Sequence, residues 1–510
     1  MTRPIRMGTA AVVVAGSVLL SRLLGLGRDA LLAGLIGVDA EADLYFDAFL
    51  VPDMLNYLLA GAYLTITLVP ILSRHLEAGD HEKANTAFTS VFRFVALAIV
   101  GLTVLMWVFA VALVDLVFPE VADPARLVSL TRLVLPAQIF LVLGALLMAV
   151  QYTHKRFVIP AAAPLIYNLG IIAGGLIGWA TGNPSPESFL LGAVAGAAIG
   201  NFGLQWFGAR RTGTWFSATR RGNSAVSEYL VLAVPLMIGQ SVAVLDEQFV
   251  RFFGQFGDEG STAALSFARR LNMVPIGVIA QAAGVAAFPF LASLAARGAT
   301  DELVETTGRA ARKTLFVAAL ATAGLIVLAR PAVRLIYQYG EFTSADSELV
   351  TRLLTIYAFS IPAWGMHQLL VRHFYAKRRM WTPVLIGTAF SLAAIPAWLG
   401  LHRAMGVEGF ALASTLVMVG YALGMLVAWG FDSGWAAVRR LAPAFARGMF
   451  SATIAGGLGL LLVNRLLPVG DIGVWAALGI GLAGGLTTLA AFLAISALLR
   501  APEMREVLGR

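Results

Sequence analysis

The stretch SRLLGLGRDALLAG, residues 21–34, places Arg22, Arg28 and Asp29 inside an otherwise apolar helical pattern. A charged side chain at the centre of a bilayer costs roughly 2.5–3.5 kcal/mol on insertion scales, so such residues usually face a partner or a water-filled cavity. Arg22 and Asp29 are seven residues apart and share one helix face, and Arg28 lies on the same side. Unpaired arginines in a membrane cavity indicate an anionic ligand, and a guanidinium group suits phosphate because it donates two parallel hydrogen bonds.

Charged residues also interrupt three other apolar segments. They are Asp43, Asp47 and Asp53 in residues 43–72, Asp246, Glu247 and Arg251 in LDEQFVR, and Arg269 and Arg270 in FARRL. One interpretation is an internal network of salt bridges. Its pairs would be Arg28 with Asp29 or Asp43, and Arg251 with Asp246 or Glu247. Arg22 and Arg270 have no obvious acidic residue one helical turn away, which favours a ligand-binding role for these two arginines.

The composition is that of an integral membrane protein. Of the 510 residues 59% are hydrophobic and 13% are charged, whereas soluble domains carry roughly 25% charged residues. Cysteine is absent, which excludes disulfides and thiolate metal sites, and the six histidines form no metal-binding motif. The net charge of +8 is explained by cytoplasmic loops rather than by nucleic acid. No cleavable signal peptide is expected, since the first apolar segment continues into a full-length span.

Hydropathy predicts an all-α polytopic membrane protein with about fourteen transmembrane helices, and twelve is the alternative. The expected ranges are 8–36, 43–72, 88–117, 126–152, 159–181, 187–209, 226–254, 261–292, 308–336, 345–376, 382–402, 407–430, 443–467 and 472–499. The connecting loops alternate between basic ones, such as ARRTGTWFSATRRG and AKRRM, and acidic or neutral ones, such as GVDAEAD and EFTSADSE. The positive-inside rule then places both termini in the cytoplasm, which requires an even number of spans.

An internal repeat divides these helices. VPILSRHLEAGDHEKA (69–84) matches FPFLASLAARGATDEL (288–303), with Pro70 and Gly79 aligned to Pro289 and Gly298. QYTHKRFVIP, which ends at Pro160, matches FYAKRRMWTP further along. Six helices separate each pair, so the two halves share one orientation and a cleft between them suits alternating access. We expect an N-terminal lobe over 1–220 with helices 1–6, a C-terminal lobe over 221–435 with helices 7–12, and helices 13 and 14 with a cytoplasmic tail over 436–510.

Several of these segments resemble the MurJ (MviN) lipid II flippases of the MOP exporter superfamily, and the resemblance covers nearly the whole chain. They are SRLLGLGRDALLA (21–33), DLYFDAFLVPDML (43–55), LVPILS (68–73), KRFVIPAAAPLIYNL (155–169), ARRLNMVPIGV (268–278), YQYGEFTSAD (337–346) and HFYAKRRMWTP (373–383). The resemblance implies fourteen helices, two parallel six-helix lobes, a central cationic cavity and a groove at helices 13 and 14 for a polyprenyl tail. It also implies transport of an undecaprenyl-diphosphate-linked peptidoglycan precursor to the outer leaflet of the bacterial cytoplasmic membrane.

The resemblance assigns roles to residues of this chain. The substrate-binding set would be Ser21, Arg22, Arg28, Asp29, Asn56 and Arg270. Asp43 would be a structural or gating acid at the start of helix 2. Asp246 falls where some relatives bind sodium, with Thr415 as a remaining polar neighbour.

The chain departs from the family pattern at several of these positions. Asn56 and Tyr57 stand where many relatives have an arginine pair, Gly61 where they often carry glutamate, and Met273 where an acid is common. The segment FSLAAIPAWLG lacks the asparagine and aspartate of helix 11 that complete the sodium site. The sodium site therefore looks incomplete, and these changes bear on the identity of the lipid-linked substrate.

Four function classes compete. The first is a lipid II flippase, and the second is a related exporter of another lipid-linked oligosaccharide, such as an O-antigen or exopolysaccharide, or a small-molecule antiporter. A polyprenyl-phosphate glycosyltransferase would need an interfacial catalytic domain, and a scaffolding pseudo-transporter would explain lost polar residues. No GxxxxGK[ST] motif is present, so we expect no cofactor and a drive from membrane potential, Na⁺ or H⁺. We expect a monomer whose partners are the lipid-linked precursor and the bilayer.

The loop charges predict residues 74–83, 210–221 and 377–379 in the cytoplasm and residues 38–42, 182–187 and 341–348 outside. Because the native chain has no cysteine, single cysteines report their own accessibility. In intact cells, a membrane-impermeant maleimide should label Glu341→Cys and should not label Asp80→Cys. Labelling of a cysteine at residue 80 would overturn this topology.

Overall fold

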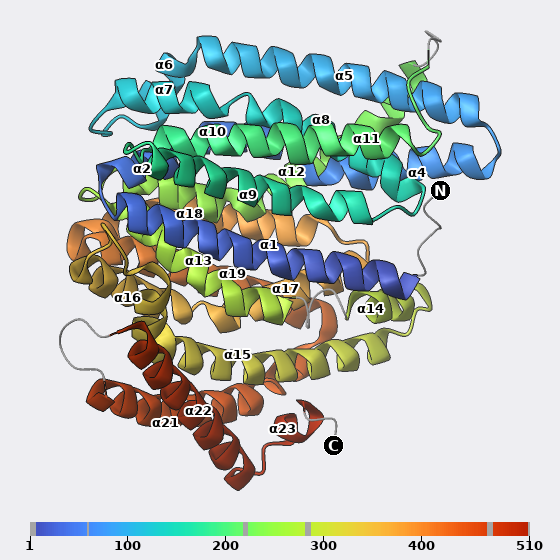
Figure 1. The fold of residues 1–510 in the computed structure, drawn as a ribbon. Coiled ribbons are helices and arrows are strands. Elements are labelled where there is room, and N and C mark those ends of the chain that lie inside the picture. Colours follow the sequence, from blue (N-terminus) through green and yellow to red (C-terminus); the bar gives the residue numbers. More distant parts are fainter. Residues whose placement is uncertain (1–6, 59–60, 218–222, 281–286, 467–472, 508–510) are drawn as a thin grey trace. The chain divides into compact units, whose positions relative to one another are not determined.

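The computed structural model describes residues 7–58, 61–217, 223–280, 287–466 and 473–507. Over these ranges the chain forms helices joined by short turns and contains no β-strand. Figure 1 draws these helices with colours that follow the sequence, from α1 in blue to α23 in red. The all-α class expected from the sequence is confirmed.

The chain divides into two compact units, Met1–Thr262 and Ala263–Arg510. The helices of the first unit are α1 (Met7–Ile36), α2 (Ala40–Asp47), α3 (Leu50–Leu58), α4 (Gly61–Glu77), α5 (His81–Val108), α6 (Ala110–Val117), α7 (Pro124–Val134), α8 (Ala137–Thr153), α9 (Val158–Ala180), α10 (Pro186–Gly196), the π-helical η1 (Ala197–Gly203), α11 (Leu204–Arg210) and α12 (Asn223–Gly254). Those of the second unit are α13 (Ser261–Ala280), α14 (Phe288–Ala296), α15 (Thr300–Tyr337), α16 (Ser344–Ala358), α17 (Ile361–Ala376), α18 (Trp381–Met405), α19 (Val407–Ser433), α20 (Trp435–Arg439), α21 (Ala442–Leu466), α22 (Val474–Leu498) and α23 (Pro502–Val507).

Among the described residues, nine helices are long and apolar enough to cross a bilayer. The number becomes ten if α16 and α17, which meet at a bend of 44°, form one broken span. Helices occupy every range in which a transmembrane segment was expected, several of them in two or three pieces. The count of fourteen spans stays a prediction.

The acidic loops contain helix starts. The side chains of Asp39 and Asp123 accept hydrogen bonds from backbone N–H groups at the beginnings of α2 and α7. Thr343 and Asp346 form a reciprocal capping box at the beginning of α16. Such caps satisfy N–H groups that have no partner within the helix. Some acidic residues of these loops are therefore explained by helix capping, in addition to the orientation of the chain in the membrane.

The repeated segments have the same local conformation in the two units. Gly79 and Gly298 end α4 and α14 with positive φ angles of 75° and 69°. After each glycine, the next backbone N–H donates to the carbonyl five positions earlier, at 2.9 and 3.1 Å. Lys155 and Arg378 form the second matched pair, with φ angles of 56° and 58° and equivalent bonds of 2.9 Å. These turns support the sequence repeat.

The helix that the repeat assigns to the beginning of the second lobe lies in the first compact unit. α12 packs against α3, α4 and α5. The lobe boundary expected after residue 220 follows from the sequence repeat, whereas the boundary between the compact units lies after Thr262. The lobe boundary stays a prediction.

Glycines let α9 and α10 approach closely. A Cβ atom added at Gly170 of α9 would lie 2.6 Å from the carbonyl oxygen of Gly192 on α10. A Cβ atom at Gly192 would in turn overlap the carbonyl oxygen of Gly170. Close backbone approach through small residues is a common way for membrane helices to pack. This contact fixes the helix that carries part of the candidate site.

We expect Gly192→Ala to destabilise the protein by about 1–3 kcal/mol, the usual cost of overpacking. The matched control is Gly101→Ala on α5, where an added Cβ meets nothing within 4 Å. Thermal unfolding of the purified variants in one detergent measures the difference. A Gly192→Ala protein that melts at or above the Gly101→Ala protein would contradict the close contact.

Candidate functional site

The C-terminal half of α1 carries a buried ion pair. Arg28 donates to Oδ1 of Asp29 from Nε at 2.9 Å and from Nη2 at 2.6 Å. The Asp29 residue is 1% exposed. Adjacent helix residues normally diverge, so this contact depends on the length of the arginine side chain. Of the two partners considered for Arg28 in the sequence, the structure shows Asp29.

Asn168 on α9 completes this group of side chains. Its Oδ1 accepts a hydrogen bond from Nη1 of Arg28 at 3.2 Å. Its Nδ2 donates to the carbonyl of Pro164 at 2.9 Å and to Oγ of Ser21 at 3.3 Å. Ser21, Arg28, Asp29 and Asn168, hereafter the α1–α9 cluster, thus join two otherwise apolar helices.

Sequence reasoning did not identify Asn168, although the motif KRFVIPAAAPLIYNL contains it. The available signal was an amide inside an apolar run, four residues after Pro164. Buried amides need hydrogen-bond partners in a membrane helix, so an isolated asparagine there predicts a polar contact with another helix. The partner helix could not be read from the sequence.

The arginines that lacked an obvious acidic neighbour are both exposed. Arg22 is exposed on α1, and Arg270 is exposed on α13. They belong to different compact units. Their convergence on one cavity therefore stays a prediction.

A second ion pair joins α3 and α12. Nη1 of Arg251 lies 2.7 Å from Oδ2 of Asp53, and the two side chains are 11% and 25% exposed. The sequence hypothesis had considered Asp246 and Glu247 as partners of Arg251. The side chains of these two residues lie outside the described part of the structure, so those alternatives are untested.

Asp43 and Asn56 make defined contacts within the first unit. Oδ2 of Asp43 accepts a hydrogen bond of 2.8 Å from the backbone N–H of Gly260, just before α13 begins. Gly260 has a φ angle of 83°, which favours glycine. Nδ2 of Asn56 donates to Oε1 of Gln138 at 2.9 Å. Asn56 is thus bonded to a neighbouring helix, α8, which does not belong to the α1–α9 cluster.

The ion-coupling candidates are only partly described. Thr415 is 4% exposed and donates to the carbonyl of Ile356 at 3.2 Å. Asp246 lies on α12, and its side chain is outside the described residues. Within the described part of the chain, no three His, Asp or Glu side chains are grouped as metal ligands.

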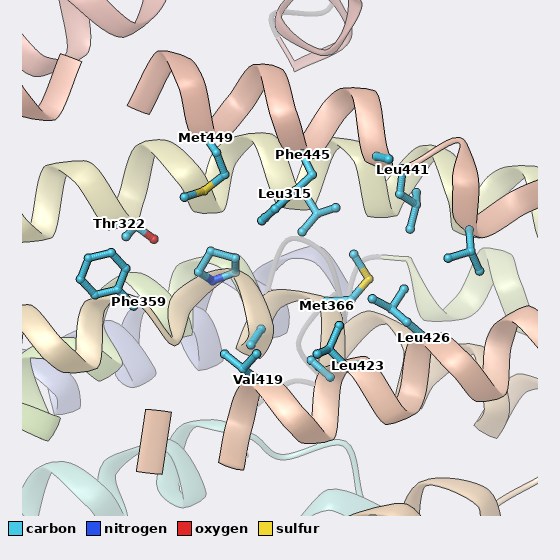
Figure 2. Close-up of a pocket in the computed structure, with 15 residues that line it drawn as sticks. Leu315, Thr322, Phe359, Met366, Val419, Leu423, Leu426, Leu441, Phe445 and Met449 are labelled. Carbon is cyan, nitrogen blue, oxygen red and sulfur yellow. The ribbon is translucent and has the colours of Figure 1, made fainter. Parts of the chain in front are cut away.

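The second unit contains an apolar pocket of about 330 Å³. Its walls come from α15, α17, α19 and α21, and Figure 2 shows Leu315, Met366, Leu423, Phe445 and Met449 around it. Among the described lining residues, Thr322 is the one that is polar, and its hydroxyl donates to the carbonyl of Ala318 on its own helix at 2.9 Å. The pocket therefore suits a hydrocarbon group rather than a charged one.

Comparison with known proteins gives consistent similarities. The family model described as lipid II flippase MurJ matches residues 32–464. A Rhizobium tropici protein described as a probable lipid II flippase MurJ is 26% identical over 475 residues, which cover 90% of this chain and 87% of that protein. The lipid II flippase MurJ of Burkholderia cenocepacia is 27% identical over 389 residues, covering 74% and 75%.

Solved structures show the same fold. A lipid II flippase MurJ in an inward closed conformation superposes with a TM-score of 0.79 at 22% identity, covering 98% of this chain and 100% of that chain. An inward-facing multidrug resistance MATE family transporter of the MOP superfamily gives a TM-score of 0.66 at 16% identity, covering 85% and 98%. At these identities the likeness concerns the fold alone.

The α1–α9 cluster generates a stability prediction. Asp29→Ala leaves the guanidinium of Arg28 buried without its counter-charge, which typically costs 3–5 kcal/mol, so we expect a loss on the order of 3 kcal/mol. Thermal unfolding of the purified protein should show a lower midpoint than that of the control Glu348→Ala, whose side chain is exposed. Adding Arg28→Met to Asp29→Ala should restore part of the loss. Equal midpoints for Asp29→Ala and Glu348→Ala would show that this pair does not stabilise the fold.

Proposed function

Since this chain belongs to the lipid II flippase MurJ family, we propose that it moves lipid II from the inner to the outer leaflet of the bacterial cytoplasmic membrane by alternating access. Lipid II is the polyprenyl-diphosphate-linked precursor of peptidoglycan. The observation that carries the proposal is the α1–α9 cluster, which keeps an arginine in a defined orientation between apolar helices. An arginine so placed provides the charge and the hydrogen-bond geometry that a diphosphate requires.

Arg28 and Arg22 have different parts in this proposal. A guanidinium has five N–H groups, and Arg28 uses three of them toward Asp29 and Asn168. Two N–H groups remain for a phosphate oxygen. Arg22 is exposed and forms no ion pair with the described residues, so it supplies uncompensated positive charge. Arg270 would add a third guanidinium from the second unit.

The apolar pocket of the second unit supports a site for the polyprenyl tail. The family resemblance implies a tail groove at helices 13 and 14, and α21 occupies the range expected for helix 13. Phe445 and Met449 of α21 line the pocket. Apolar side chains there would bury methyl-branched hydrocarbon, with a gain of about 25 cal/mol per Å² of apolar surface removed from water.

Transport requires a driving force other than nucleotide hydrolysis, because no phosphate-binding loop is present in the sequence. The membrane potential acts on the diphosphate charge at about 2.3 kcal/mol per charge per 100 mV. For coupling to Na⁺ or H⁺ we propose Asp246, with Thr415 as a second candidate residue. We propose that the protein acts as a monomer with both termini in the cytoplasm and catalyses no covalent chemistry.

A related exporter function is the second candidate, and the environment of Asn56 favours it. Where many relatives carry arginine, this neutral amide bonds Gln138 at 2.9 Å. Its substrate would be another lipid-linked oligosaccharide or a small molecule. Failure of the wild-type chain, at normal membrane levels, to sustain cells depleted of their lipid II flippase would favour this candidate.

We expect Arg28→Ala and Arg270→Ala to abolish complementation of cells depleted of their lipid II flippase, and Arg22→Ala to impair it. Arg28→Lys should also impair it, because an ammonium group keeps the charge but loses the planar fork. Flipping and complementation are measured at matched membrane protein levels, with the exposed Arg297→Ala as control. Near-normal activity of all three alanine variants would remove the phosphate-binding role.

A further inference from the structure

A pocket at one end of the first unit has an acidic lining. It lies among α2, the loop between α6 and α7, the end of α12 and the turn that follows α12, and its volume is about 170 Å³. Half of its fourteen described lining residues are acidic, and none of these fourteen is basic. The acidic residues are Glu41, Asp43, Asp47, Glu120, Asp123, Asp258 and Glu259. Carboxylates concentrated in a recess raise the local concentration of cations.

Several of these carboxylates already have partners. Oε2 of Glu41 lies 2.7 Å from Nη2 of Arg126. Asp123 caps α7, and Asp43 accepts a hydrogen bond from Gly260 at 2.8 Å. These contacts account for the positions of Glu41, Asp123 and Asp43, and no bound ligand is needed to explain them. They leave the deepest acid of the pocket to be explained.

Asp47 is that acid. It is 2% exposed. The side chain of Thr262 interacts with its carboxylate, but its Oδ1 has no hydrogen-bond partner among the described residues. Asp43, one helical turn earlier on α2, adds a like charge nearby. Arg251 lies within electrostatic range of Asp47, but its Nη1 donates to Asp53 at 2.7 Å. A buried carboxylate oxygen without a partner is costly, and a cation in the pocket would remove that cost.

We propose that this acidic pocket binds one hydrated divalent cation, with Asp47 Oδ1 and the Asp43 carboxylate as its protein oxygen donors. Carboxylate oxygens are the ligands that Mg²⁺ and Ca²⁺ prefer. Two carboxylates fill only part of the coordination shell, so the ion would keep several of its waters, as Mg²⁺ commonly does. Among the described residues, no three His, Asp or Glu side chains are grouped so that they could hold a metal ion directly. The pocket has room for them, because one buried water needs only about 10–15 Å³.

The bound cation would connect segments that are far apart in the sequence. Asp47 belongs to α2, whereas Asp258 and Glu259 belong to the turn between α12 and α13. The loop charges predict this end of the unit to be external, where divalent cations are abundant. The site involves neither the α1–α9 cluster nor the lipid substrate, so it is independent of the proposed flippase function.

The test uses MnCl₂ as the paramagnetic probe, with the purified full-length protein in detergent and no lipid substrate. Electron paramagnetic resonance of free Mn²⁺ should show one saturable site per chain, and added MgCl₂ or CaCl₂ should displace the probe. Asp47→Asn, which keeps the size of the side chain, should raise the Kd at least tenfold. Glu348→Gln, which neutralises an exposed acid of the second unit, should leave the Kd unchanged.

Other results would overturn the proposal. They are the absence of a saturable site, an unchanged Kd in Asp47→Asn, or displacement by NaCl as effective as by MgCl₂ at equal ionic strength. Thermal unfolding without added cation shows whether Asp47→Asn is folded. If it is not, the double variant Asp258→Asn/Glu259→Gln at the exposed rim takes its place. It should weaken binding severalfold, and an unchanged Kd would again contradict the site.

Discussion

An ionised side chain inside a bilayer is costly unless a partner in the protein or water compensates it, and two compensated arginines link helices of the first unit. Asp29 compensates Arg28 within α1, and Asn168 extends that pair to α9. Asp53 compensates Arg251 across 198 residues of sequence, which ties α3 to α12. Separating either pair would leave an uncompensated charge in an apolar environment, at a cost of several kcal/mol. The polar contacts therefore specify partners that apolar packing alone would leave open.

α9 combines this polar role with close packing. It contacts both α1 and α10. Asn168 faces the arginine of α1, while Gly170 and Gly174 admit the backbone of α10. In a membrane, helix association relies on close van der Waals contact and on interhelical hydrogen bonds, since lipid is as apolar as leucine. A single helix that provides both kinds of contact gives Arg28 a rigid support, which a phosphate-binding group requires.

The sequence predicted the helical ranges and the repeat, and it offered Asp29 as one of two partners for Arg28, because each of these has a short-range signal. Hydropathy marks the spans, Gly79 and Gly298 mark equivalent turns, and Asp29 is adjacent to Arg28 in the chain. The Asp53–Arg251 pair, the contact of Asn168 with Arg28 and the burial of Asp47 depend on which helices are neighbours. Helical periodicity indicates that a polar side chain needs a partner, but it does not say which helix provides that partner. Resemblance to a family supplied roles for residues, and it gave no reason to single out Asn168.

A diphosphate site needs to attract its anion and to orient it, and in the α1–α9 cluster different residues supply these two properties. Arg28 and Asp29 together have no net charge. The pair therefore contributes to the orientation of a bound phosphate and not to the attraction of a distant anion. Asn168 contributes no charge either, and Asn56 is bonded to Gln138. Among the described residues of α1 and α9, Arg22 is therefore the residue that supplies net attraction for an anion. Long-range attraction increases with the number of uncompensated positive charges, whereas orientation depends on the fixed N–H groups of Arg28. A site built in this way binds its anion weakly from a distance and selects it at contact by geometry. A carrier benefits from that combination because it must release what it has bound.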